Sequence, residues 1–187
     1  MRRVSVVGST GSGKTTFARA LAGILDVPCV ELDALNWEAN WRMASEEVFR
    51  ARSAEATRGE AWVVDGNYGG RGAREIVWGR ADTVVWLDYP LWLILARLTR
   101  RNLVRIRSGE EIWPGTGNRE TLRNSFFARG SLYVWALKTY RRRKREMPEL
   151  LRLPAYAHLE VHHLRRPAEA DRWLEAQRAA RYARIQS

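Results

Sequence analysis

The feature that most constrains the fold of this chain is a glycine-rich loop near its beginning. Residues 8–15 read Gly-Ser-Thr-Gly-Ser-Gly-Lys-Thr and match the pattern G-x-x-x-x-G-K-[S/T] at every fixed position. A short β-branched run, Arg3–Val7, precedes the loop, and a helical pattern from about Lys14 to Leu25 follows it. Glycines let backbone N–H groups turn inward, and these amides, with the positive end of the helix, hold phosphate oxygens. The loop therefore predicts a polyphosphate site.

The same pattern predicts what two side chains of the loop do. Lys14 is expected to reach the β and γ oxygens of a nucleoside triphosphate, and Thr15 is expected to ligate Mg²⁺. ATP and Mg²⁺ are therefore the expected cofactors. The residues expected to bind them are Gly8, Ser9, Thr10, Gly11, Ser12, Gly13, Lys14, Thr15 and Thr16.

Predicted strands and helices alternate along the chain. The strands are continuous apolar runs, which is typical of strands covered on both faces, as in parallel sheets. Ser45 is placed to cap one helix, and Pro90 falls in the first turn of another. This order predicts an α/β fold with a five-stranded, doubly wound parallel sheet. The expected strands are 3–7, 28–32, 61–65, 83–87 and 158–164; the expected helices are 14–25, 45–58, 90–107, 120–146 and one from Pro167, with Pro148 and Pro154 breaking the chain after the fourth.

Length and composition narrow the class of protein. The 187 residues, 45% apolar, fit a single domain over residues 1–187. No run of 18 uncharged apolar residues occurs, and the glycine-rich loop comes too early for a signal peptide, so we expect no membrane contact. The single cysteine, Cys29, cannot form an internal disulfide, and a cytoplasmic location is expected.

The charge is concentrated in the second half of the chain. Residues 96–187 hold 21 Lys or Arg and 9 Asp or Glu, a net charge of +12, whereas residues 1–95 carry a net charge of −1. This surplus suggests a polyanionic ligand such as nucleotide phosphates, nucleic acid or anionic lipid. Five consecutive cations, 141–145, point all round a helix, so a solvated helix end is the favoured interpretation and nucleic-acid contact is the alternative.

Three carboxylates follow predicted strands and could lie near the metal. Asp33, Asp65 and Asp88 each stand at the end of such a strand, and spacing alone does not choose among them. The three histidines lie in or beside the last strand, where adjacent residues point to opposite faces, so no metal site is expected there.

The loop, the Asp-Gly after the third strand and the arginines after the fourth resemble the adenylate kinase-like P-loop kinases, and so indicate a P-loop NTPase fold. A closer resemblance, over nearly the whole chain, is to bacterial topology modulation proteins. The residues that carry it are 32–37 (Leu-Asp-Ala-Leu-Asn-Trp), 65–68 (Asp-Gly-Asn-Tyr), 74–78 (Arg-Glu-Ile-Val-Trp), 84–88 (Val-Val-Trp-Leu-Asp) and 117–120 (Gly-Asn-Arg-Glu).

The resemblance implies roles for the acidic residues. Asp65 would face the metal and its waters, and Asp33 would act as general base or orient the acceptor. The segment of about 33–60 would bind the acceptor. Its substrate-binding candidates are Asp33, Trp37, Tyr68, Arg71 and Arg74, with Trp37 either stacking on a ligand or packing in the core. Asn67-Tyr68-Gly69-Gly70 stands where adenylate kinase has Phe-Pro-Arg, which argues against AMP as the acceptor.

The resemblance also implies roles for arginines beside a short lid of about 107–122. Arg97 would stack on adenine and Arg101 would contact phosphates, and a spacing of four puts both on one helical face. Arg119 and Arg123, one turn apart, would cover the transferring group, and the closed lid would exclude water. The expected catalytic residues are Lys14, Asp33, Arg119 and Arg123.

Two functions remain in view. The first is an ATP- and Mg²⁺-dependent phosphotransferase, which moves the γ-phosphoryl group to a hydroxyl or phosphate of a small molecule. The second is a nucleotide-dependent nucleic-acid-binding or regulatory protein, motivated by the basic second half of the chain. Because no recognition-helix or RNA-binding pattern occurs, we rank the phosphotransferase first.

Overall fold

The computed structural model describes residues 1–121 and 132–186. Its main sheet has five strands in the order β2-β5-β1-β6-β7, and every neighbouring pair is parallel. The strand that leads into the glycine-rich loop is therefore central, between β5 and β6. The strands are β1 (Arg3–Gly8), β2 (Cys29–Glu31), β5 (Trp62–Asp65), β6 (Thr83–Leu87) and β7 (Glu160–Leu164).

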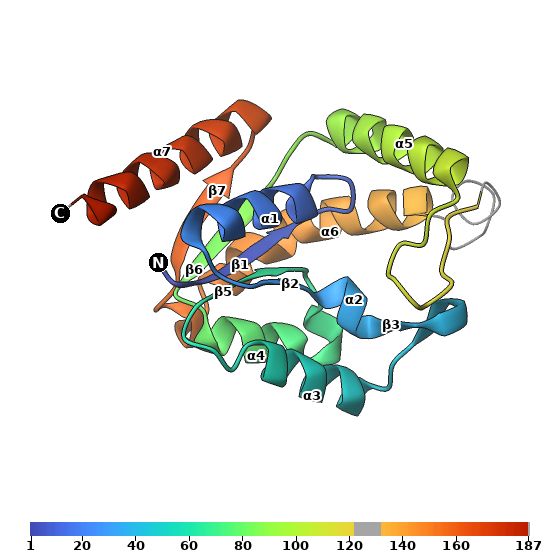
Figure 1. Cartoon of the computed structure of the whole chain (residues 1–187), viewed down its shortest axis with the longest axis horizontal. Coiled ribbons are helices and arrows are strands. Elements are labelled where there is room, and N and C mark those ends of the chain that lie inside the picture. Colours follow the sequence, from blue (N-terminus) through green and yellow to red (C-terminus); the bar gives the residue numbers. More distant parts are fainter. Residues whose placement is uncertain (122–131, 187) are drawn as a thin grey trace.

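Helices cover both faces of the sheet (Figure 1). One apolar core joins the sheet to α1, α5 and α7, and the other joins it to α3, α4 and α6. Successive residues of β1 supply the two cores in turn, with Val6 in the first and Val7 in the second. The helices are α1 (Lys14–Leu25), α2 (Leu32–Asn36), α3 (Glu46–Ala56), α4 (Ala73–Arg80), α5 (Leu91–Ser108), α6 (Leu132–Leu151) and α7 (Pro167–Ile185).

A small hairpin lies outside the main sheet, between α2 and α3. Its strands, β3 (Trp37–Glu38) and β4 (Arg42–Met43), pair antiparallel around a 3₁₀ turn over Ala39–Trp41. Ser45 ends this connection as the N-cap of α3, where its hydroxyl accepts a hydrogen bond of 3.2 Å from the amide of Val48. The expected cap is confirmed, whereas the hairpin has no period long enough for sequence patterning to reveal it.

Three expectations about elements are wrong. The second strand ends at Glu31, because Leu32 starts α2 and its buried side chain packs in the core. Thr121 and the residue before it are not helical, and the described part of the fourth long helix begins at Leu132. Pro148 lies inside α6 and does not end it, since burial of Met147 and of the leucines after the proline against the core favours one more helical turn.

None of the helices in the described ranges is long and apolar enough to cross a membrane.

Candidate active site

The glycine-rich loop joins the carboxyl end of β1 to the amino end of α1. Gly13 is the N-cap of α1 with a φ of 91°, and Gly11 has a φ of 84°, which side chains other than glycine rarely adopt. A Cβ on Gly11 would lie 2.7 Å from the carbonyl oxygen of Ile94, so the loop also packs too tightly against α5 for a side chain there. The loop therefore leads directly into the amino end of α1, where the free backbone amides and the helix dipole favour an anion.

The side chains of Lys14 and Thr15 each donate a hydrogen bond within the protein, and their contact with phosphate and Mg²⁺ stays a prediction. The Lys14 ammonium donates a hydrogen bond of 3.3 Å to the carbonyl oxygen of Ser9. Burial lowers the pKa of Lys14, and the nearby carboxylate of Asp65 opposes that shift. The hydroxyl of Thr15 donates to Oδ2 of Asp65, at the end of the neighbouring strand β5. The sheet therefore brings the expected metal ligands of β5 and α1 together.

Asp65 has the environment expected of a metal ligand. Its side chain is buried, and its Oδ1 has no hydrogen-bond partner among the described residues. Burial raises the pKa of Asp65, while Lys14 and the hydroxyl of Thr15 act to lower it. An unpartnered carboxylate oxygen beside a threonine hydroxyl fits Mg²⁺, which prefers oxygen ligands and completes its shell with water and phosphate. Among the described residues, no group of three or more His, Cys, Asp or Glu side chains is arranged so that it could hold a metal ion by itself.

Asp88, the third carboxylate at a strand end, is engaged elsewhere. Its Oδ2 lies 3.0 Å from Nε2 of His163, whose ring stacks on Trp86, and 4.0 Å from Nζ of Lys144. These neighbours hold the Asp88 carboxylate against β7 and α6. The tertiary contacts thus distinguish Asp65 from Asp88, which spacing in the sequence could not do.

Two residues with no predicted role fix the first residue of the loop. The Asn67 side chain accepts from the amide of Gly8 over 2.9 Å and donates to its carbonyl oxygen over 2.6 Å. Nη1 of Arg143, on α6, donates to the same carbonyl over 3.2 Å, and burial lowers the pKa of Arg143 to about 10. Asn67 could have been suspected from its place after the Asp-Gly motif. Nothing local in the sequence distinguishes Arg143 from the cations around it.

Arg143 requires a correction to the interpretation of the basic run. The run does not form a solvated helix end, because α6 continues to Leu151. Within the run, Arg143 turns inward to the glycine-rich loop of residues 8–15, called the phosphate loop below. Arg142 instead pairs with Glu146 at 3.6 Å on the exposed side. Consecutive helical residues do diverge in direction, and one of the five points at the site.

On the other side of the loop, Asp33 and Tyr68 form a polar pair. The hydroxyl of Tyr68 donates to Oδ1 of Asp33, and burial together with that carboxylate raises the pKa of Tyr68. The Asp33 carboxylate is exposed, and its charge acts on those of Lys14, Arg101 and Arg143. An acid from α2 therefore lies within the electrostatic reach of three cations from α1, α5 and α6.

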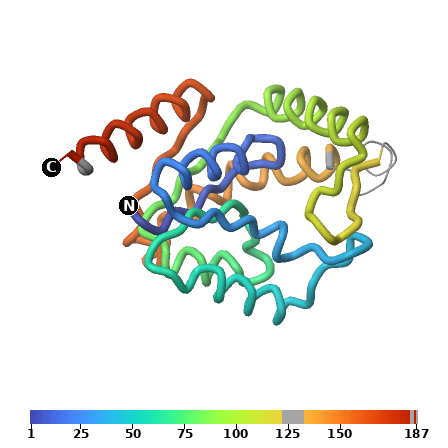
Figure 2. Tube along the Cα trace, viewed as in Figure 1, coloured from blue at the N-terminus to red at the C-terminus, as the bar shows by residue number. Residues whose placement is uncertain are grey.

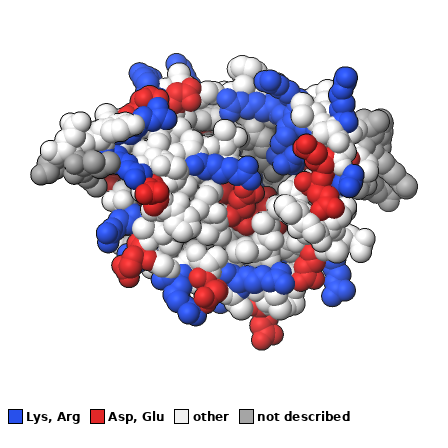
Figure 3. All heavy atoms as spheres, in the orientation of Figure 1, with Lys and Arg blue, Asp and Glu red and all other residues white. Residues whose placement is uncertain are grey.

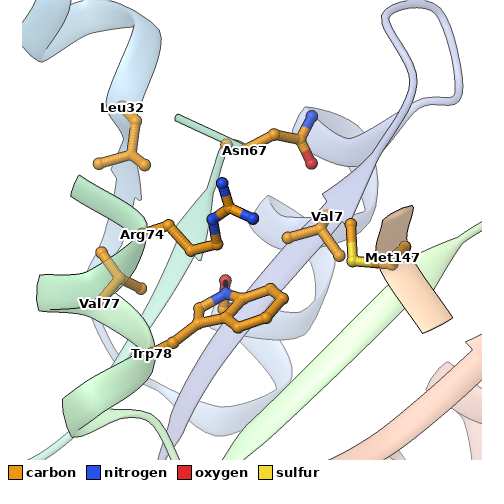
Figure 4. Close-up of a pocket in the computed structure, with 9 residues that line it drawn as sticks. Val7, Leu32, Asn67, Arg74, Val77, Trp78 and Met147 are labelled. Carbon is orange, nitrogen blue, oxygen red and sulfur yellow. Dashed lines mark hydrogen bonds between the residues drawn. The ribbon is translucent and has the colours of Figure 1, made fainter. Parts of the chain in front are cut away.

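The two arginines expected to contact the acceptor are held in different ways. Arg71 donates to Oδ1 of Asn36 and to the carbonyl oxygen of Ala44, and its guanidinium lies 5.3 Å from the centre of the Phe49 ring. Figure 4 shows the guanidinium of Arg74 in a small cavity, between the labelled side chains of Asn67 and Trp78. The contact of either side chain with a substrate stays a prediction.

The arginines of α5 line an open cavity beside the loop. Nη1 of Arg97 donates to the carbonyl oxygen of Ser12 over 3.0 Å, and its guanidinium lies 5.3 Å from the centre of the Tyr89 ring. Burial lowers the pKa of Arg101, one turn further along. Figure 3 shows basic side chains gathering over the α5 side of the molecule. The cavity, of about 350 Å³, is lined by Arg97, Arg100, Arg101, Val104 and Arg105.

The expected lid is partly described. Residues 109–121, called the lid loop below, follow α5, so positions 107 and 108 are helical. Arg119 pairs across the loop with Glu111 in an antiparallel bridge and donates over 2.6 Å to the carbonyl oxygen of Gly109. Arg119 thus closes the base of the lid loop in this structure. Arg123, its expected partner, lies outside the described residues.

Trp37 packs against Trp41, which in turn packs against Trp113. Its ring lies 5.7 Å from that of Trp41, and the ring of Trp41 lies 6.0 Å from that of Trp113 in the lid loop, both edge to face. Figure 2 shows the lid loop reaching the chain around β3 and β4. Trp37 is only partly buried, so part of its side chain is accessible to solvent.

Comparisons with known proteins bear on the fold of the chain. Residues 4–64 match the family described as "ATPase family associated with various cellular activities (AAA)". No curated protein matches the sequence.

Solved structures of other proteins align with nearly the whole chain. Shikimate kinase from Acinetobacter baumannii, in complex with shikimate, is 19% identical over 94% of this chain and 90% of its own, with a TM-score of 0.55. A gluconokinase from Sinorhizobium meliloti 1021 is 20% identical over 100% and 97%, with a TM-score of 0.52. A sugar kinase from Janibacter sp. HTCC2649 is 22% identical over 94% and 93%, with a TM-score of 0.51. With its central β1, its glycine-rich loop and its parallel sheet covered on both faces, the chain has the α/β P-loop NTPase fold that these kinases share.

Proposed function

We propose that the protein is an ATP- and Mg²⁺-dependent phosphotransferase that moves the γ-phosphoryl group to a hydroxyl or phosphate of a small-molecule acceptor. The observation that carries the proposal is the position of Asp33. Its exposed carboxylate, paired with the hydroxyl of Tyr68, acts on Lys14 across the phosphate loop. A carboxylate at this position can accept the proton of an acceptor hydroxyl or orient that group toward the γ-phosphorus. The kinase fold of the solved neighbours supports the same choice.

The phosphate loop would bind and orient the triphosphate. Its amides and Lys14 bind the phosphate oxygens, and Thr15 and Asp65 would hold Mg²⁺. When bound, Mg²⁺ neutralises charge that develops on the β and γ oxygens. Asn67 and Arg143 hold the carbonyl of Gly8, so the first residue of the loop keeps its orientation when the phosphates change.

The acceptor would lie between the loop and α2. The Asp33 carboxylate accepts the proton of an acceptor hydroxyl or orients that group toward the γ-phosphorus, and Tyr68 fixes the direction of the carboxylate. Trp37 offers a ring face for the body of the acceptor. In our proposal Arg71 and Arg74 would attract an anionic group of the acceptor.

Cations would stabilise the transferring group. Charge builds up on the equatorial oxygens during the transfer, and a positioned arginine accelerates such reactions by about 10³–10⁵-fold. Arg101 and Arg143 reach the neighbourhood of Lys14 from α5 and α6. In our proposal Arg119 and Arg123 join them when the lid loop closes, and Arg97 contacts the adenine.

The experiment is an acceptor screen that measures ADP release from ATP and Mg²⁺. The panel should include sugars, hydroxy acids, nucleosides and nucleoside monophosphates, with Lys14→Ala as the blank. We expect one class to stimulate ADP release and Asp33→Asn to abolish the stimulation. Asp88→Asn is the matched control, since its carboxylate faces His163 and should leave the stimulation intact. ADP release that no acceptor stimulates would contradict the proposal.

A second candidate function rests on the outer side of α6. Lys138, Arg141, Arg142 and Arg145 are exposed there, together with Trp135, which is 50% exposed. A basic helix with an exposed aromatic ring can bind a nucleic-acid backbone and stack on a base. Binding of mixed single-stranded RNA or DNA would weaken steeply with salt and would be lost in Arg141→Ala/Arg142→Ala. Absence of a salt-dependent complex at 50 mM salt, a low ionic strength, would exclude this candidate.

A further inference from the structure

One buried amide side chain joins the lid loop to the acceptor segment. Asn118 is 1% exposed, and its Oδ1 accepts a hydrogen bond of 2.8 Å from the backbone amide of Trp41. Its Nδ2 donates over 2.8 Å to the carbonyl oxygen of Glu38. Asn118 is 77 positions from Trp41 and 80 from Glu38, so the contact is tertiary and not a property of the local turn.

The orientation of Asn118 is fixed from within the lid loop. Its backbone amide donates over 3.2 Å to the hydroxyl of Thr116, and its backbone carbonyl oxygen accepts over 2.9 Å from the amide of Ile112. The side chain therefore cannot follow the hairpin unless the lid loop moves with it. The ring of Trp113, packed on Trp41, adds an apolar contact between the same two segments.

The hairpin on the other side of this contact is in an unusual conformation. Asn40 and Trp41 have φ values of 59° and 56°, in the left-handed region that residues with a bulky side chain rarely adopt. Such a conformation persists when surrounding contacts determine it. The bonds from Asn118 span this turn, since they reach the residue before it and its last residue.

The position of the hairpin gives this contact a consequence for the site. The hairpin begins at Trp37, directly after α2, which carries Asp33. On the other side of the Asn118 contact is the lid loop. It follows α5, which carries Arg97 and Arg101 beside the phosphate loop. Asn118 thus connects the acceptor side of the site to the nucleotide side without passing through the sheet.

We propose that Asn118 is a positioning residue that couples the acceptor segment to the lid loop, so that the two move as one body. This inference rests on the proposed function. Nucleotide binding that draws in the lid loop would carry Trp37 and the hairpin toward the phosphate loop, and an acceptor bound at Trp37 would favour the closed lid in turn. Transfer to the acceptor would thereby be favoured over hydrolysis, because water is excluded only when both segments are in place.

Hydrogen–deuterium exchange tests the coupling without knowledge of the acceptor. In the ligand-free protein, Asn118→Ala should speed exchange of the Trp41 amide by about 3- to 10-fold, the effect of one lost hydrogen bond. Asn118→Asp keeps an acceptor oxygen for that amide and should restore most of the protection. Addition of the non-hydrolysable analogue AMP-PNP with Mg²⁺ should slow exchange in both 37–43 and 109–119 of the wild type, but only in 109–119 of Asn118→Ala.

The matched control is Glu111→Ala. The Glu111 carboxylate accepts from the amide of Gly115 over 2.9 Å, so its loss loosens the lid loop without touching the hairpin. In this variant AMP-PNP should still protect residues 37–43.

Two results would overturn the inference: unchanged exchange of the Trp41 amide in ligand-free Asn118→Ala, or protection of 37–43 by AMP-PNP in that variant as strong as in the wild type. A wild-type protein that binds no AMP-PNP by calorimetry would overturn the proposed function, and the coupling to nucleotide with it, even where Asn118 still protects the hairpin.

Discussion

Arg143 donates a hydrogen bond from Nη1 to the carbonyl oxygen of Gly8, across 135 positions of the chain and over 3.2 Å. The contact joins α6 to the first residue of the phosphate loop. One arginine of a run of five cations thus contacts the glycine-rich loop, while its neighbours remain on the surface.

The first prediction separates Arg143 from its neighbour. Arg143→Ala should lower kcat by about 10²–10³-fold, as removal of one preorganised donor does in other active sites. Arg143→Lys should restore little, because lysine lacks the planar fork. Arg142→Ala removes only an exposed ion pair with Glu146 and should leave kcat within about twofold. Steady-state ADP release measures all three, and equal losses in the Arg142 and Arg143 variants would refute the assignment.

The second prediction concerns pH and Asp65. Burial raises the pKa of Asp65, so the folded protein holds that proton more tightly than the unfolded chain, where the pKa is about 3.9. Stability from this group is therefore present at low pH and lost as pH rises through the raised pKa. Asp65→Asn should remove the loss. In thermal melts without Mg²⁺ from about pH 4 to 8, the Tm of the variant minus that of the wild type should increase as pH rises.

The control is Asp82, a carboxyl group whose pKa is shifted in the opposite direction. Burial acts to raise the pKa of Asp82. Hydrogen bonds from Thr83 and from the backbone amides of Arg3 and Arg2 outweigh that effect and hold this pKa below its usual value. Stability from Asp82 is therefore present above the unfolded pKa and lost as pH falls. This change falls at lower pH than that of Asp65, so the melts for Asp82 run from about pH 2 to 5. Over that range the Tm of Asp82→Asn should fall relative to that of the wild type as pH rises, and a rise instead would count against the assignment.

The third prediction compares two glycines. Gly11→Ala forces a Cβ to 2.7 Å from the carbonyl oxygen of Ile94 at a φ of 84°, and should cost about 1–3 kcal/mol of stability together with nucleotide binding. Gly23→Ala, inside α1 with open space around it, should stabilise the protein by about 0.5–1 kcal/mol. Urea unfolding and calorimetry with ATP and Mg²⁺ measure the two effects; a Gly11 variant that binds ATP normally would contradict the described loop.

The fourth prediction links the core to the acceptor side. Phe49 is fully buried, its ring lies 4.8 Å from that of Tyr68, and the guanidinium of Arg71 lies above it. Phe49→Ala should cost about 3–5 kcal/mol and loosen the Tyr68 side chain that holds Asp33. Val48→Ala, at a neighbouring position that is 39% exposed, should change stability by less than about 0.5 kcal/mol. Urea unfolding tests both, and equal effects would contradict the packing described.

Much of the fold could be predicted because its signals are local. The limits of α1 and β6 and the start of α7 agree with the expectations from sequence, since a glycine-rich loop, a short apolar run and a proline mark them. The hairpin of β3 and β4 could not be predicted from the sequence, because strands of two residues are too short to show a periodic pattern. The turn beyond Pro148 escaped because burial of Met147 in the core is a tertiary gain that outweighs a local preference.

The sequence by itself determined the phosphate loop, the parallel sheet around it and the small set of acids that could serve a metal, because spacing along eight residues and short apolar runs is enough to specify them. Only the tertiary structure decided that Asp65 meets Thr15, that Asp88 meets His163, that Arg143 reaches Gly8 and that Asn118 joins the lid loop to the hairpin. Each of these contacts joins residues more than 45 positions apart. Their partners are chosen by the order of strands and the packing of helices, which no short stretch of residues encodes.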